Sequence, residues 1–162
     1  YDVVIATELL EHVRAPGHVL EVLSKGLKRG GALVLTTPNA SYFRTRLPTY
    51  GNATESELSS LEDASADGDA HRYLFTALEL RILLRAQGFE VMSAGWMLPV
   101  WLEGHLKLRH LYRFLGERLA TALLARLPVK TKNAFFADLF VSQWIVARKN
   151  FSGSREDHEG ER

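Results

Sequence analysis

YDVVIATELLEHV, residues 1–13, passes directly from apolar residues to charged ones. Its first part, residues 1–6, is short, apolar and rich in β-branched side chains, which predicts a buried β-strand. The part that follows carries Glu8, Glu11 and His12 and is expected to form the turn after that strand. Because a buried strand rarely leads into so much charge, we expect the end of this strand to face a ligand.

A helix and a second strand are expected next. Pro16 suits the first position of a helix, where its missing N–H costs nothing, and apolar side chains recur on one face of residues 17–28. Glycines 30 and 31 end that helix, and residues 32–37 (ALVLTT) are a second continuous apolar run. Two strands joined by one helix predict a right-handed parallel βαβ unit whose helices cover the sheet.

The same alternation returns in the second half of the chain. Thr76 is placed to cap a helix that ends at Gly88, and a third strand begins at Phe89. The last strand is expected over residues 138–149, which are apolar and rich in β-branched side chains. The chain therefore has the pattern of an α/β protein.

Three segments interrupt or follow this pattern. Residues 40–70 are irregular and form an acidic loop, and residues 97–128 form an inserted segment with leucines at helical spacing. We expect one partial domain over residues 1–149 and a disordered polar tail over residues 150–162.

Composition excludes several classes of protein. The 162 residues carry a formal net charge of +1, so no overall charge attracts nucleic acid, and no nucleic-acid partner is expected. The chain contains no cysteine, which excludes disulfides and thiolate catalysis and is compatible with a cytoplasmic location. No apolar stretch approaches the ~20 residues that span a bilayer.

Three stretches are fairly specific when they occur in this order and spacing: YDVVIATELLEHV, LKRGGALVLTTPN and HRYLFTALELRILLRAQGFEV. They resemble the C-terminal half of class I S-adenosylmethionine-dependent methyltransferases of the type 11/23, ubiquinone O-methyltransferase-like subgroup. The resemblance implies part of a Rossmann-like sheet, with strands in the order 4-5-7-6, strand 7 antiparallel, and a helical insertion between strands 6 and 7.

The resemblance also implies that half of the domain lies elsewhere. The glycine-rich loop after the family's strand 1 and the acidic residue ending its strand 2 hold the cofactor, and neither is expected in this chain. The missing N-terminal half is therefore an expected partner, and we expect the chain alone to bind S-adenosylmethionine poorly. Its first strand is expected to have an unpaired edge.

The cofactor is expected beside the end of the first strand. In open α/β sheets, ligands bind beyond the carboxyl ends of the strands, which places Ala6, Thr7 and Glu8 in position to contact it, as the resemblance also implies. An oxygen acceptor must in addition lose a proton, and His12 is the candidate general base.

A metal site is the other reading of the acidic turn. Glu8, Glu11 and His12 share one face if the turn is helical, and this set suits Mg²⁺ or another divalent ion. The spacing resembles that of metal-dependent ubiquinone-pathway and small-RNA 3′-end methyltransferases, in which a later histidine completes the site, as His71 would here. A structural or cofactor-only role for the same residues remains open.

The resulting prediction is a methyltransferase fragment that methylates an oxygen atom of a small-molecule, lipid or glycan acceptor. A non-enzymatic methyltransferase-like interaction module is the alternative. Residues 98–127 combine basic and aromatic side chains, so this segment is expected to contact a membrane surface if the protein is peripheral to a membrane.

Overall fold

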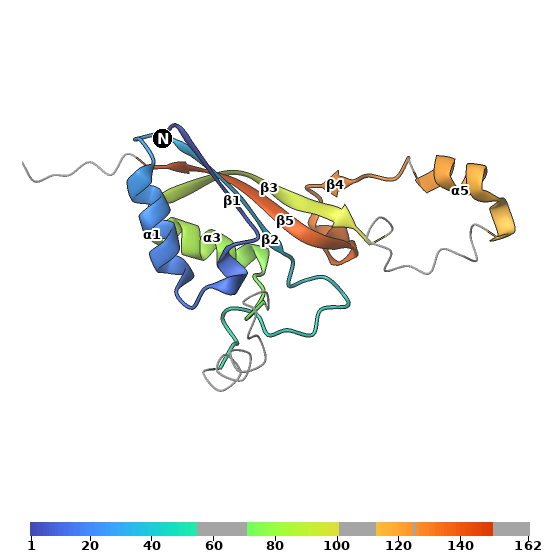
Figure 1. Ribbon diagram of the computed structural model, residues 1–162, viewed down its shortest axis with the longest axis horizontal. Coiled ribbons are helices and arrows are strands. Elements are labelled where there is room, and N and C mark those ends of the chain that lie inside the picture. Colours follow the sequence, from blue (N-terminus) through green and yellow to red (C-terminus); the bar gives the residue numbers. More distant parts are fainter. Residues whose placement is uncertain (55–70, 101–112, 125, 151–162) are drawn as a thin grey trace, which may run out of the picture.

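The computed structural model describes residues 1–54, 71–100, 113–124 and 126–150. Its elements in chain order are β1 (Val3–Thr7), η1 (Leu10–His12), α1 (Pro16–Gly26), β2 (Ala32–Pro38), α3 (Ala77–Ala86), β3 (Phe89–Pro99), α5 (Glu117–Leu124), β4 (Lys130–Thr131), η2 (Ala134–Leu139) and β5 (Phe140–Lys149). The two η elements are 3₁₀-helices. These elements form a mixed α/β structure, as the sequence pattern predicts (Figure 1).

The five strands form one sheet in the order β1-β2-β5-β3-β4. β1 and β2 are parallel, with Val3 opposite Ala32 and Thr7 opposite Thr36, which confirms the predicted βαβ unit. β5 runs antiparallel to both of its neighbours, β2 and β3. The carboxyl ends of β1 and β2 therefore lie side by side at one end of the sheet.

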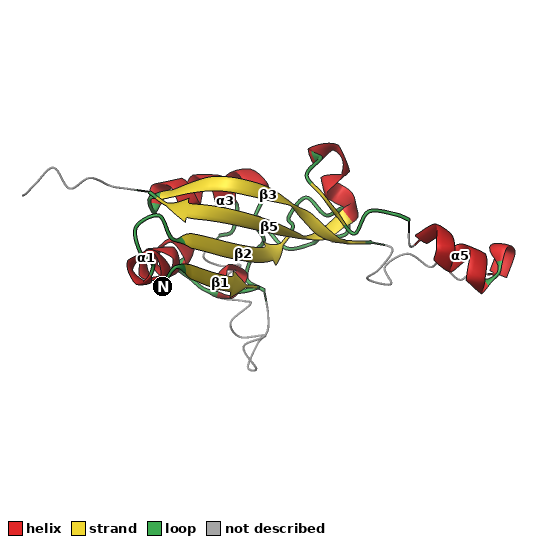
Figure 2. Ribbon diagram, turned by 90° about the horizontal axis from the view of Figure 1, so that it is seen from above, coloured by secondary structure: helices red, strands yellow, loops and turns green. Residues whose placement is uncertain are grey.

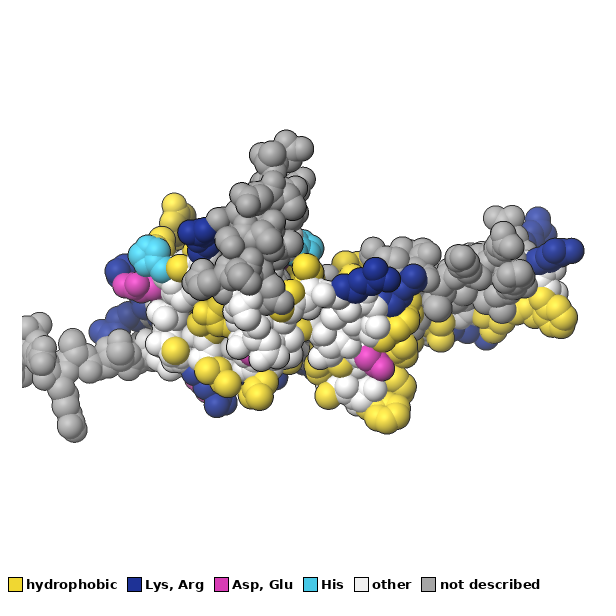
Figure 3. All heavy atoms as spheres, turned by 90° about the horizontal axis from the view of Figure 1, so that it is seen from below, with side chains coloured by type: hydrophobic (Ala, Val, Ile, Leu, Met, Phe, Trp, Pro, Cys, Tyr) yellow, Lys and Arg dark blue, Asp and Glu magenta, His cyan; other side chains and the backbone are white. Residues whose placement is uncertain are grey.

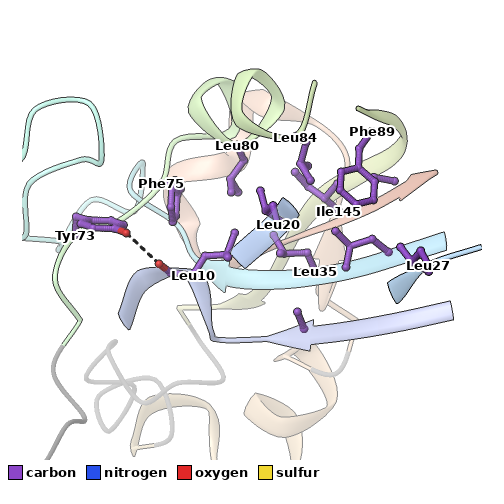
Figure 4. Close-up of a cluster of buried hydrophobic side chains, with 13 residues drawn as sticks. Leu10, Leu20, Leu27, Leu35, Tyr73, Phe75, Leu80, Leu84, Phe89 and Ile145 are labelled. Atoms are coloured by element: carbon purple, nitrogen blue, oxygen red, sulfur yellow. Dashed lines mark hydrogen bonds between the residues drawn. The ribbon is translucent and has the colours of Figure 1, made fainter. Parts of the chain in front are cut away.

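Helices α1 and α3 lie on the same face of the sheet and cover its core (Figures 1 and 2). Alternate residues of the strands, such as Leu33 and Leu35 of β2, point into this core and meet Leu20 of α1 and Leu80 of α3 (Figure 4). Neighbouring residues of β1 point to the other face, where Val3 and Ile5 are exposed.

Hydrogen bonds from polar side chains stabilise the start of α3 and the end of α1. The Thr76 hydroxyl accepts from the Glu79 N–H while the Glu79 carboxylate accepts from the Thr76 N–H, which forms a capping box at the start of α3. At the end of α1, the Lys149 ammonium donates to the carbonyls of Ser24 (2.6 Å) and Leu27 (2.9 Å). The last strand is thereby tied to the first helix.

Several predicted boundaries differ from the structure. β1 includes Thr7 and excludes residues 1–2, and β3 continues to Pro99, into the predicted insertion. Residues 138–139 belong to η2 rather than to the last strand, because Asn133 caps a 3₁₀-helix by accepting from the Phe135 N–H.

The insertion and the tail are described only in part. Residues 101–112 of the insertion and the tail from residue 151 lie outside the described residues, as does most of the acidic loop. In the described part, Phe114 is 88% exposed and Leu119 and Leu123 are also exposed.

Hydrophobic and basic side chains lie next to each other at this end of the molecule (Figure 3), and membrane-surface contact through residues 98–127 stays a prediction. None of the described helices is long and apolar enough to cross a membrane.

β1 is an edge strand, since it pairs only with β2 among the described elements. Such an edge favours pairing with another chain. We therefore expect the chain to self-associate with increasing concentration in sedimentation velocity. Ile5→Lys, which replaces a side chain that is 68% exposed on β1, should reduce this association. Val22→Lys, at an exposed position of α1, is the matched control. A chain that stays monomeric at all concentrations would contradict this expectation.

Candidate functional site at the end of β1

The turn after β1 begins with a residue in the left-handed conformation. Glu8 has φ of 47°, and its N–H donates to the Thr36 carbonyl at 2.9 Å. A non-glycine residue with positive φ is uncommon and is found more often at functional sites. The conformation ends the strand and directs the chain into η1. Glu8 therefore lies outside the helical turn, so the predicted shared helical face with Glu11 and His12 is not formed.

The three predicted cofactor-contacting residues end β1 in different environments. The Ala6 side chain is buried in the hydrophobic core, whereas Thr7 and Glu8 are exposed. Of these three residues, Thr7 and Glu8 have side chains exposed at this end of the sheet.

Glu11, His12 and His71 form a compact cluster. Each offers a ligand atom, and these atoms lie within 4.8 Å of one another. His12 Nε2 is 3.9 Å from Glu11 Oε1, and the rings of the two histidines meet edge to face with centroids 4.8 Å apart. His71 belongs to a segment that is distant from Glu11 and His12 in the sequence. This segment is attached to the rest of the fold by parallel bridges from Leu74 to Thr49 and from Phe75 to Asn39.

The Glu11 carboxylate is fully buried, with 0% of the residue exposed. Its Oε2 accepts from the Thr37 hydroxyl at 2.9 Å, and Thr37 is itself buried at the end of β2. Glu11 Oε1 and His12 Nδ1 are buried with no hydrogen-bond partner among the described residues. Because an unpaired buried carboxylate oxygen is costly, this arrangement favours a donor or a cation as occupant.

Glu8 is electrostatically coupled to this cluster. Although the Glu8 side chain is exposed in part, partial burial of its carboxyl group, followed by the negative charge of Glu11, raises the pKa of Glu8 from 4.5 to about 7. Burial, followed by the charge of His12, lowers the pKa of His71, although Glu8 acts in the opposite direction. The four predicted metal ligands thus influence one another, although only Glu11, His12 and His71 lie close enough to share an ion.

The raised pKa of Glu8 predicts a pH-dependent stability. The folded chain holds a proton on Glu8 more tightly than the unfolded chain, so this contribution to stability is complete below pH 4.5 and is lost as the pH rises to about 7. Solvent reaches Glu8, so the loss is smaller than that for a fully buried carboxyl. Urea unfolding of the chain in chelator-treated buffer should show the loss, and Glu8→Gln should remove it. The same slope in both proteins would contradict the assignment.

The sequence did not indicate every residue of the cluster. Thr37, whose hydroxyl donates to the Glu11 carboxylate, is in the sequence only the last residue of an apolar run. Its signal was a threonine at the carboxyl end of a strand that neighbours β1 in the sheet.

Comparison with known proteins assigns the family. Residues 1–94, more than half of the chain, match the methyltransferase-domain family. The chain therefore belongs to the methyltransferase-domain family. A search of curated proteins found no match.

Solved structures of methyltransferases are similar to part of this chain. An S-adenosylmethionine-dependent methyltransferase from Mesorhizobium loti is similar with a TM-score of 0.52 and 13% identity, over 92% of this chain and 62% of that one. A methyltransferase of the same cofactor class from Archaeoglobus fulgidus has a TM-score of 0.49 and 16% identity, over 91% of this chain and 59% of that one. The likeness to the Mesorhizobium loti structure indicates that the five-stranded sheet resembles part of a methyltransferase fold. This chain spans less than two thirds of either structure.

Proposed function

We propose that this chain supplies the acceptor-side half of an S-adenosylmethionine-dependent methyltransferase that methylates an oxygen atom of a small-molecule, lipid or glycan acceptor. The observation that carries the proposal is the buried Glu11 carboxylate, which has one oxygen without a partner and lies beside two histidines just beyond the end of β1. Family membership supplies the reaction class.

The residues at the end of β1 suit the cofactor. S-adenosylmethionine, when bound, supplies an electrophilic methyl group on a sulfonium centre and also carries an ammonium group. Thr7 and Glu8 are exposed where strand ends bind ligands, and a cation would relieve the repulsion between Glu8 and Glu11. Ala6 offers its backbone rather than its buried side chain.

His12 is proposed as the general base. Methylation of a hydroxyl requires that its proton be removed, and an imidazole is suited to this near neutral pH. Glu11 Oε1, 3.9 Å from His12 Nε2, would stabilise the imidazolium after proton transfer. His12 keeps a quarter of its side chain exposed, at 25%, so an acceptor can reach it.

A divalent ion is the alternative role for the same residues. Glu11, His12 and His71 would hold the ion, with Glu8 near enough to add a carboxylate after a side-chain movement. One carboxylate and two imidazoles suit Zn²⁺ or Mn²⁺, and Mg²⁺ would need further oxygen ligands. Such an ion would lower the pKa of an acceptor hydroxyl.

The N-terminal half of the family domain is the proposed partner for β1. It would pair with the open edge of β1 and supply the glycine-rich loop, so this chain alone should bind the cofactor weakly. Isothermal titration that detects micromolar binding of S-adenosylmethionine to this chain would contradict this part of the proposal.

Weak binding can be tested by NMR titration of the isotope-labelled chain. Millimolar S-adenosylmethionine should shift the amides of Ala6, Thr7 and Glu8, and substoichiometric Mn²⁺ should broaden the His12 and His71 signals if the cluster holds an ion. Glu21→Gln, an exposed helix position, is the matched control and should change neither response. No shift near β1 would refute cofactor contact and favour the non-enzymatic interaction module, for which the open β1 edge is the supporting observation.

A further inference from the structure

We propose that Arg72 and Tyr73 are positioning residues that hold the Glu11–His12 turn against His71. The proposal deepens the proposed function, because it concerns how the same cluster is assembled. Both residues follow His71 directly in the sequence. Arg72 donates hydrogen bonds to two carbonyls of η1, and the Tyr73 hydroxyl reaches one carbonyl of η1 and that of Val13, the residue after it.

The two residues reach four consecutive carbonyls. The Arg72 N–H donates to the Glu11 carbonyl at 2.9 Å, and Arg72 Nε donates to the His12 carbonyl at 3.0 Å. The Tyr73 hydroxyl lies between the carbonyls of Leu10, at 3.2 Å, and Val13, and can donate to either (Figure 4). Every carbonyl from residue 10 to residue 13 is therefore within reach of this dipeptide.

The turn has little stability of its own. η1 has only three residues, and its own hydrogen bonds are long, at 3.2 Å from His12 N–H to Leu9 and 3.5 Å from Val13 N–H to Leu10. Its first residue has no side-chain cap. A single helical turn of this kind is marginal without outside contacts. The bonds from Arg72 and Tyr73 supply those contacts.

Tyr73 is itself rigidly held. It is 1% exposed, and its ring packs against Tyr50 and Phe75 with centroid distances of 5.1 Å and 5.3 Å. Figure 4 shows its hydroxyl directed toward η1 from the aromatic part of the core. Tyr73 thus fixes the position of the turn relative to the hydrophobic core. The segment that contains Tyr73 also brings His71 into contact with His12.

Tyr73→Phe tests the role without removing the ring. The nuclear Overhauser effect between the His12 and His71 rings should be lost or strongly weakened, because their edge contact depends on the turn. Exchange of the Arg72 amide proton should accelerate by up to about tenfold, the factor that corresponds to one lost hydrogen bond. Tyr50→Phe is the matched control, since Tyr50 belongs to the same aromatic cluster and the described contacts of its side chain are ring contacts.

A ring–ring signal and an Arg72 exchange rate equal to those of the Tyr50→Phe protein would overturn the proposal. If Tyr73→Phe unfolds, Arg72→Gln is the second variant, because it removes the bond from Arg72 Nε to the His12 carbonyl at a half-buried position. The ring–ring signal and the exchange rate of the amide at position 72 then test the proposal in that variant. Both measurements are made without cofactor or metal. Their outcome is therefore independent of whether the chain binds S-adenosylmethionine.

Discussion

Glu11→Gln is expected to abolish the response of the site to S-adenosylmethionine and to Mn²⁺ without lowering the stability of the chain. The carboxylate is fully buried, and among the described residues it has one hydroxyl donor, from Thr37. Since a buried charge with incomplete compensation is destabilising, its neutral isostere should be tolerated or stabilising. NMR titration measures the first effect and urea unfolding the second.

The same substitution should lower the pKa of Glu8. Burial is the largest cause of the raised value of about 7 and would remain, while the charge of Glu11, the second cause, would be gone. The pKa of Glu8 should therefore fall but stay above 4.5, as read from the pH dependence of its side-chain carboxyl carbon signal. An unchanged pKa of Glu8 would show that Glu11 does not face Glu8. A retained response to S-adenosylmethionine would show that Glu11 does not face the ligand. Glu21→Gln again serves as control.

Asn39→Ala is expected to cause the largest loss of stability. Asn39 is 1% exposed at the end of β2, and its Nδ2 donates to the carbonyls of Ala137 (2.7 Å) and Phe140 (2.9 Å). Its Oδ1 accepts from the Ser41 N–H at 3.0 Å. Each buried group left unpaired costs about 1–3 kcal/mol, so we expect the free energy of unfolding to fall by ~3 kcal/mol or more.

Chemical denaturation of the chain measures this loss. Asn52→Ala, at an exposed loop position, is the control and should change the free energy of unfolding by less than about 0.5 kcal/mol. A loss in Asn39→Ala no larger than that of the control would mean that water replaces the lost donors. Asn39→Asp, which keeps the acceptor for Ser41 but loses the donors, should resemble Asn39→Ala.

Local signals in the sequence were sufficient for the first half of the fold. The apolar run before Thr7, the proline at position 16 and the second apolar run predicted β1, α1 and β2 and their parallel pairing. Thr76 predicts a cap, and the structure adds Glu79, three residues later, to form a capping box. These features depend on neighbours within a few residues.

Contacts between distant residues could not be predicted in the same way. Two of these contacts join segments that are more than 20 residues apart in the sequence. They are the hydrogen bond from Thr37 to Glu11 and the bonds from Arg72 and Tyr73 to the turn. The left-handed conformation of Glu8 could not be predicted, because a glutamate gives no local signal for positive φ. The pairing of His71 with His12 was anticipated only through the family resemblance.

The place of β1 in the sheet has a consequence for how a complete catalyst could be built. Glu11 and His12 follow β1, an edge strand of the described sheet, and His71 lies beside them. Any polypeptide that pairs with the free edge of β1 would therefore lie close to these side chains, and strand pairing alone would place it there. The segment that pairs with this edge would then also define the surroundings of the groups proposed for proton transfer.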